Sequence, residues 1–345
     1  MSSPVAQVVD LADQWPCIDP FLFCVHHVDQ YPAANPSMGP DASLAGRSIG
    51  SDFEGLDGWR MYHGSTIPGF PQHPHRGFET ITYARQGFID HADSLGASAR
   101  FGRGDVQWMT AGSGVVHSEM FPLFDVDGPN PVELFQIWIN LPAEDKMADP
   151  HFSMLWDRDI PRISVTDSAN KVTKITVIAG SLQDHTPASP PPHSWASRTD
   201  ADVAIWHIVM EAGAQYELPA AGPETVRAVY VFSGDTLQVA DTNVRNRQAA
   251  VCAAGVPLAL TAGSEPTEVL VLQGRPIGEP VARYGPFVMN TEAEIEETFA
   301  AYRQTQFGGW PWPKPDPTHG GEATRFAKHS SGKVEAPDVE SSPST

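Results

Sequence analysis

Two short histidine motifs are the residues of this sequence best suited to chemistry. They are His73-Pro74-His75 and His117-Ser118-Glu119. In an extended strand, residues two apart project from the same face, so each motif would direct two ligating side chains into one space. Two such strands in one barrel would form a site of three histidines and one carboxylate, which suits a first-row divalent metal such as Fe(II), Mn, Ni or Cu. Around an octahedral ion, such a set leaves two positions for water, substrate or O₂.

A single His-x-His pair is weak evidence by itself. The chain has thirteen histidines, which also produce chance neighbours such as His26-His27. The second motif follows about forty residues later in a glycine-punctuated stretch, and this repetition makes coincidence a poorer explanation. Other chemistries fail on spacing: Ser113 lacks the glycine two residues before it that a nucleophile elbow requires, and Gly102-x-Gly104 lacks the third glycine of a dinucleotide-binding fingerprint.

The elements that must position these residues are strands. Short alternating segments separated by Gly and Pro fill almost the whole chain, as in 132–139 and 203–209. They are rich in β-branched and aromatic residues, a pattern that predicts an antiparallel sandwich or barrel. The pattern occurs around 70–145 and again around 172–275. The sequence therefore predicts an all-β chain of two domains in tandem, joined by a polar, proline-containing connection.

One helix is predicted near the end, over residues 291–305. Thr291 and Glu294 form a capping box at its start, and Gly308-Gly309 ends it. The composition beyond it predicts a flexible tail over 313–345.

Composition narrows the class of protein. The chain of 345 residues has 22 Lys+Arg against 42 Asp+Glu, a net charge of −20, which argues against a nucleic-acid partner. No apolar run approaches the length needed to span a membrane. Three cysteines make no disulfide framework and fit a reducing compartment. With no signal-peptide pattern at the start, we expect a soluble, cytoplasmic protein.

Three longer strings resemble the pirin family of the cupin superfamily. They are Gly69–Thr80, Gly104–Glu119, and Gly285–Thr291 with the acidic helix and Phe307-Gly308 that follow it. The resemblance covers residues 15 to 310 and implies two cupin (jelly-roll-like) β-barrels in one chain, a bicupin, with a C-terminal helix. The implied boundaries are an N-terminal metal-binding domain over 1–165 and a C-terminal domain without metal over 171–312.

The resemblance also implies a ligand set, a metal and an activity. By position, the metal ligands are His73, His75, His117 and Glu119. The metal expected is Fe(II), with Mn, Ni, Cu or Zn as alternatives, and Glu119 is also the expected catalytic base. The activity expected is that of a quercetin 2,3-dioxygenase, an oxidoreductase that cleaves a flavonol or similar enolic aromatic with O₂. The alternatives are an iron-dependent redox sensor that regulates a transcription factor or metabolic enzyme, and a bicupin acting on an unrelated small molecule.

Two features depart from the expected patterns. The general cupin pattern would place its carboxylate ligand at Glu79, which here becomes a candidate to orient a ligand, or a strand residue paired with Arg76 or a backbone donor. The segment 31–65 is longer than expected in a pirin, and it either narrows the metal pocket or forms a surface loop. In the second domain, His185, His193 and His207 have no partner two residues away, so this domain is expected to be structural.

Overall fold

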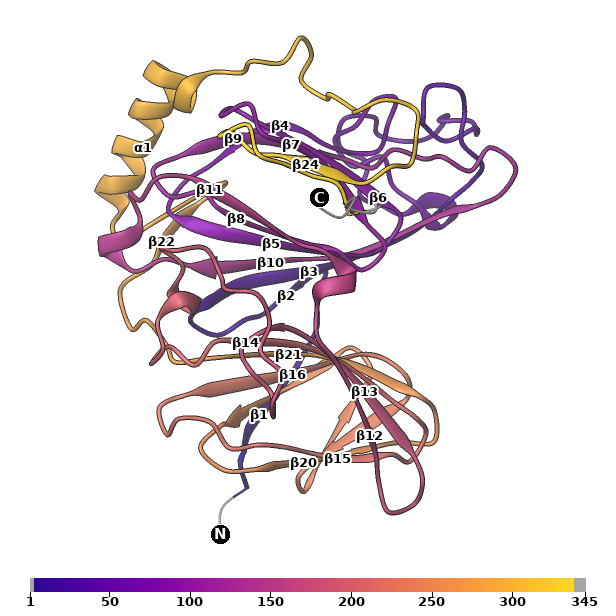
Figure 1. The fold of residues 1–345 in the computed structure, drawn as a ribbon, viewed down its shortest axis with the longest axis vertical. Coiled ribbons are helices and arrows are strands. Elements are labelled where there is room, and N and C mark those ends of the chain that lie inside the picture. The colour runs from indigo at the N-terminus through magenta and orange to yellow at the C-terminus, as the bar shows by residue number, and fades with distance from the viewer. Residues whose placement is uncertain (1–2, 338–345) are drawn as a thin grey trace, which may run out of the picture. The chain divides into compact units, whose positions relative to one another are not determined.

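The computed structural model describes residues 3–337, whose regular secondary structure is almost entirely β-strand (Figure 1). The strands fall into two compact units. Unit 1 comprises Met1–Val25, Ile137–Pro142 and Arg158–Gly278, and unit 2 comprises His26–Gln136, Ala143–Asp157 and Glu279–Thr345. The predicted all-β architecture with two cupin barrels and one C-terminal helix is confirmed.

The strands that carry the histidine motifs form a six-stranded antiparallel sheet in unit 2. Its order is β25-β24-β7-β6-β9-β4. The bounds are β4 Gly69–His75, β6 Phe88–Asp93, β7 Ser98–Gly102, β9 Val115–Met120, β24 Phe326–Lys328 and β25 Val334–Glu335. A second sheet has the order β11-β8-β5-β10-β3-β2. Its bounds are β2 Gln14–Trp15, β3 Phe21–Tyr31, β5 Phe78–Gln86, β8 Val106–Thr110, β10 Asn130–Asn140 and β11 His151–Leu155.

Unit 1 has a seven-stranded sheet of order β1-β19-β16-β21-β14-β13-β12 and a four-stranded sheet of order β15-β20-β17-β18. The bounds are β1 Val5–Asp10, β12 Arg162–Thr166, β13 Val172–Ala179, β14 Ala204–Met210, β15 Gln215–Leu218, β16 Val226–Ser233, β17 Thr236–Val239, β18 Thr242–Arg245, β19 Gln248–Ala253, β20 Leu258–Ala262 and β21 Thr267–Gly274. Its core is aliphatic, with buried residues such as Val229, Val231, Val269 and Val271. Alternating strand residues supply this core, as the period of two requires.

The predicted helix is confirmed as α1, Glu292–Thr305, with Thr291 as its N-cap in a complete capping box. In the structure it groups with unit 2. Its aromatic face packs on the hairpin of β22 (Ala282–Tyr284) and β23 (Phe287–Met289), where the ring centroids of Phe299 and Phe287 are 5.0 Å apart, and Val116 of β9 belongs to the same apolar cluster. No helix among residues 3–337 is long and apolar enough to cross a membrane. Short 3-10 turns cover Leu56–Gly58, Ala143–Asp145, Asp157–Asp159, Trp195–Ser197 and Gln306–Gly308.

The segment after the helix is structured where it is described, so the predicted flexible tail is wrong for that part. β24 pairs with β7, and Arg325 binds the buried carboxylate of Asp105 at 3.0 Å. The indole of Trp156 donates to Glu335 at 2.8 Å. The pairing of β24 uses the free edge of β7, which the composition of the tail does not reveal. Residues 338–345 of the predicted tail lie outside the described part of the chain.

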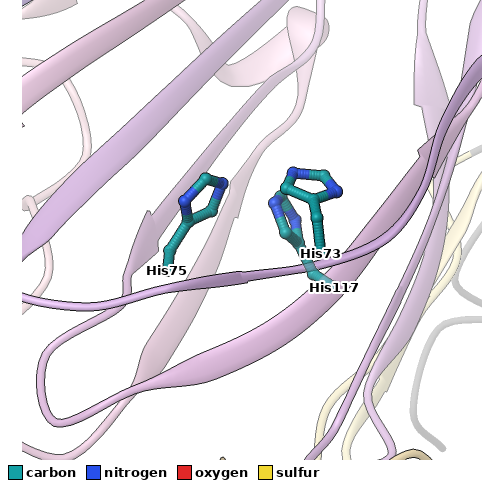
Figure 2. A group of neighbouring side chains, drawn as sticks. All are labelled: His73, His75 and His117. Atoms are coloured by element: carbon teal, nitrogen blue, oxygen red, sulfur yellow. The ribbon is translucent and has the colours of Figure 1, made fainter. Parts of the chain in front are cut away.

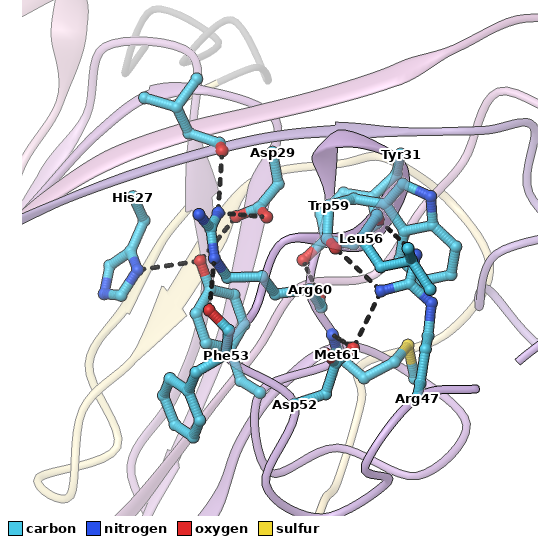
Figure 3. A network of polar contacts seen from close by, with 12 residues as sticks. His27, Asp29, Tyr31, Arg47, Asp52, Phe53, Leu56, Trp59, Arg60 and Met61 are labelled. Carbon is cyan, nitrogen blue, oxygen red and sulfur yellow. Dashed lines mark hydrogen bonds and ion pairs between the residues drawn. The ribbon is translucent and has the colours of Figure 1, made fainter. Parts of the chain in front are cut away.

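The long segment 31–65 folds around one buried carboxylate. Asp52 accepts hydrogen bonds from the Arg47 guanidinium and from the Met61 backbone amide, both at 2.9 Å (Figure 3). The guanidinium of Arg47 also lies 3.3 Å from the centroid of the Trp59 ring. The segment is therefore an ordered part of unit 2, built on its own polar and aromatic contacts.

Candidate metal centre

Three imidazoles meet on one face of the β4–β9 pair. His73 lies directly opposite His117 in the antiparallel register, and His75 follows two residues later on the same face. Figure 2 shows the three rings turned toward one another on the same side of the ribbon. One ring nitrogen from each histidine lies within 4.8 Å of the other two. The structure thus brings together three of the four predicted ligands.

Backbone carbonyls orient two of these rings. His73 Nδ1 lies 2.8 Å from the Pro71 oxygen, and His75 Nδ1 lies 3.3 Å from the Pro286 oxygen. A carbonyl oxygen can only accept, so Nδ1 must carry the proton in both residues. Each ring therefore presents an unprotonated Nε2, which is the usual arrangement of a histidine ligand and its orienting partner.

His117 is the member of the triad whose hydrogen bonding is incomplete. Its side chain is fully buried, and neither ring nitrogen finds a hydrogen-bond partner within the described chain. A buried polar group without a partner costs free energy, and an ion at the site would remove that cost. Burial lowers the pKa of all three imidazoles, that of His73 to about 4. The rings are therefore neutral near pH 7, the form that coordinates a metal. This donor set fits a divalent first-row ion.

Glu119 faces the same interior from β9, two residues after His117. Its Oε1 accepts a hydrogen bond from the Thr82 hydroxyl and its Oε2 accepts one from the Gln136 amide, both at 2.9 Å. Burial raises the pKa of the carboxyl, and His91, Thr82 and Gln136 act in the opposite direction. The group of mutually close ligand atoms found among residues 3–337 contains the three histidines and not Glu119. Its role as a fourth ligand stays a prediction.

Sequence reasoning missed several residues of this interior. Gln136 is a polar residue within the apolar run of β10, and such a residue at an inward position is a usable signal. His91 and Asp93 of β6 form a His-x-Asp pair of the same spacing as the two motifs. His91 Nε2 lies 3.2 Å from Asp93 Oδ2, and its ring centroid is 5.5 Å from that of His117.

The remaining candidates have other partners. Glu79 is fully buried and accepts a hydrogen bond from Thr110 at 2.6 Å. In unit 1, His207 pairs with Glu268 at 2.9 Å. Cys17, Cys24 and Cys252 are free thiols. No other cluster of three or more metal-ligating side chains was found within the described residues.

Comparison with known proteins agrees with this fold. Residues 14–139 match the pirin family model, and residues 205–308 match the model of the pirin C-terminal cupin domain. A relative from Pseudomonas aeruginosa, named "Putative quercetin 2,3-dioxygenase", is 38% identical over 69% of this chain and 79% of its own length. A pirin-like protein of Solanum lycopersicum is 34% identical over 76% of this chain and 86% of its own.

Solved structures show the same likeness. The crystal structure of a quercetin 2,3-dioxygenase from Acinetobacter baumannii superposes with a TM-score of 0.68 at 29% identity, covering 88% of this chain and 98% of that one. Two cupin domains, with three clustered histidines on β4 and β9, indicate a candidate metal site. The chain belongs to the pirin family.

Proposed function

We propose that this protein is a metal-dependent dioxygenase that cleaves a flavonol or a similar enol-bearing aromatic with O₂. The observation that carries the proposal is the triad His73, His75 and His117, in which both nitrogens of the buried His117 lack a partner within the described residues. The names of the relatives from Pseudomonas aeruginosa and Acinetobacter baumannii support the substrate class. The proposed metal is Fe(II), and Glu119 is the proposed fourth ligand and base.

In this proposal the histidines hold the metal and Glu119 takes up the proton of the substrate. When bound, the metal supplies a Lewis acid for the enolic hydroxyl and a redox-active centre for O₂. His73 and His75 each direct Nε2 toward the site, because their Nδ1 protons are held by carbonyls. Glu119 accepts one hydrogen bond on each carboxylate oxygen. Each oxygen has two acceptor sites, so the carboxylate retains capacity to take the proton of the substrate hydroxyl.

The test is turnover of quercetin by iron-loaded protein. We expect consumption of O₂, release of carbon monoxide and loss of the flavonol absorbance. His75→Ala should abolish metal binding and turnover together, whereas Glu119→Gln should impair turnover more than metal content. His207→Ala, a histidine paired with Glu268 in unit 1, is the matched control and should retain both.

The outcome also separates the proposal from its main rival. Tight metal binding without turnover of any flavonol would contradict the dioxygenase and favour a redox-sensing protein that binds a regulatory partner.

A further inference from the structure

A second histidine site lies on β3, outside the metal triad. His27 shares a face of the strand with Asp29, two residues later. Its Nδ1 lies 2.9 Å from the hydroxyl oxygen of Tyr62, and that hydroxyl lies 2.6 Å from Asp29 Oδ2. Arg60 completes the network by binding Asp29 Oδ1 at 3.1 Å (Figure 3). The ion pair with Arg60 keeps this carboxylate in place as an acceptor.

The network determines which nitrogen of His27 carries the proton. The Tyr62 hydroxyl donates to the Asp29 carboxylate, so its oxygen accepts from His27 Nδ1–H. The lone pair of His27 then lies on Nε2, which makes no hydrogen bond to a described residue. Burial lowers the pKa of His27 to about 3, with smaller contributions from Arg60 and His26, so the ring is neutral at physiological pH. His27 Nε2 is therefore a hydrogen-bond acceptor that no described residue uses.

Aromatic rings connect this acceptor to the metal triad. We call Phe53, Tyr62, His63 and Phe70 the ring wall. The Phe70 ring lies 5.9 Å from that of His27 and 6.3 Å from that of His73, so it touches both sites. Phe53 lies 5.6 Å from Tyr62 and remains 46% exposed. Tyr62 belongs to the buried core of unit 2 and Phe70 packs against that core, so Phe53 is the exposed ring at the edge of this cluster.

Three of the four ring-wall residues come from the segment 31–65. We infer that His27 and the ring wall form the outer half of the substrate site and select substrates with a second, hydroxylated aromatic ring. That ring stacks against Phe70 and Phe53, and its hydroxyl donates a hydrogen bond to His27 Nε2. This assignment rests on the proposed function for the location of the first ring, at the metal triad.

Equilibrium binding tests the inference independently of turnover. Quercetin, whose second ring carries two hydroxyls, is compared with galangin, whose second ring carries none. Their dissociation constants for the metal-loaded protein are measured under nitrogen by quenching of tryptophan fluorescence. In His27→Phe we expect quercetin to bind about two- to tenfold more weakly, the value of one hydrogen bond, while galangin is little changed.

Matched variants keep the test sharp. His27→Gln retains an acceptor and should keep part of the preference for quercetin. His26→Phe changes the neighbouring histidine, which instead bonds Glu133 at 2.9 Å, and should leave the preference unchanged. If His27→Phe weakens the binding of both ligands equally, or of neither, the inference is overturned. A thermal melt checks that each variant is folded. If quercetin binds with this preference but is not cleaved, the outer site stands and the dioxygenase proposal fails.

Discussion

Replacing His117 with leucine should leave the metal-free protein at least as stable as the wild type and remove its response to metal. The prediction depends on the two ring nitrogens of His117, which are buried without a partner in the described chain. Leucine is similar in size and brings no polar atom into this position, and no hydrogen bond is lost. Because leucine fills most of the space of the imidazole, the substitution leaves little cavity, and the loss of stability from a cavity is therefore small.

The expected change in the free energy of unfolding differs between the metal-free and the metal-bound protein. An unsatisfied buried polar group costs about 1–3 kcal/mol, so metal-free His117→Leu should equal the wild type or exceed it by up to about 2 kcal/mol. A metal present at one hundred times its dissociation constant should stabilise the wild type by about 2.7 kcal/mol and leave the variant unchanged. The order of stability should therefore reverse when metal is added.

Thermal unfolding in chelator and in excess Ni(II), chosen because it does not oxidise in air, measures both states. Elemental analysis of the same samples reports the bound metal. His207→Leu is the control, because it loses the bond to Glu268 and should be destabilised equally with and without metal. If His117→Leu is several kcal/mol less stable than wild type in chelator, and metal does not stabilise the wild type, then His117 is a packed core residue and the metal-site reasoning is refuted.

Two further substitutions test how unit 2 is held together. Arg325→Ala leaves the buried carboxylate of Asp105 without its guanidinium at 3.0 Å, so urea unfolding should show a loss of about 1–3 kcal/mol. Lys146 is buried and donates to the Gly77 oxygen at 2.9 Å, and burial lowers its pKa to about 8 from 10.5. Between these values the unfolded chain binds more protons than the folded one, so stability rises with pH. Relative to Lys146→Met, the wild type should gain about 1–3 kcal/mol between pH 7 and pH 10, and a flat difference would contradict the shifted pKa.

The metal triad was accessible to sequence reasoning because strand periodicity is local. His73 and His75 share a face whatever their strand pairs with, and the second motif points to the partner strand. The groups that orient the ligands could not be predicted in this way. The carbonyl that holds His75 belongs to Pro286, 211 residues away, and no spacing rule connects the two.

The segment 31–65 and the tail could not be predicted for a related reason. Their composition is rich in Gly, Pro and polar residues, which resembles that of a loop, while their order comes from single buried contacts. Asp52 organises the first, and the free edge of β7 receives the second as β24. Such contacts depend on which acceptor or edge is left open elsewhere in the fold, and local propensity contains no information about that.

The two barrels show what distinguishes a site from a scaffold when the fold is shared. In unit 1 the inward positions of β16 and β21 carry valines, and His207 is satisfied by Glu268. In unit 2 the inward positions of β9 carry His117 and Glu119, and the imidazole of His117 has no partner among residues 3–337. An interior polar group of this kind lowers stability unless a ligand satisfies it. Under the proposed function, the two barrels would differ through the side chains at alternate strand positions.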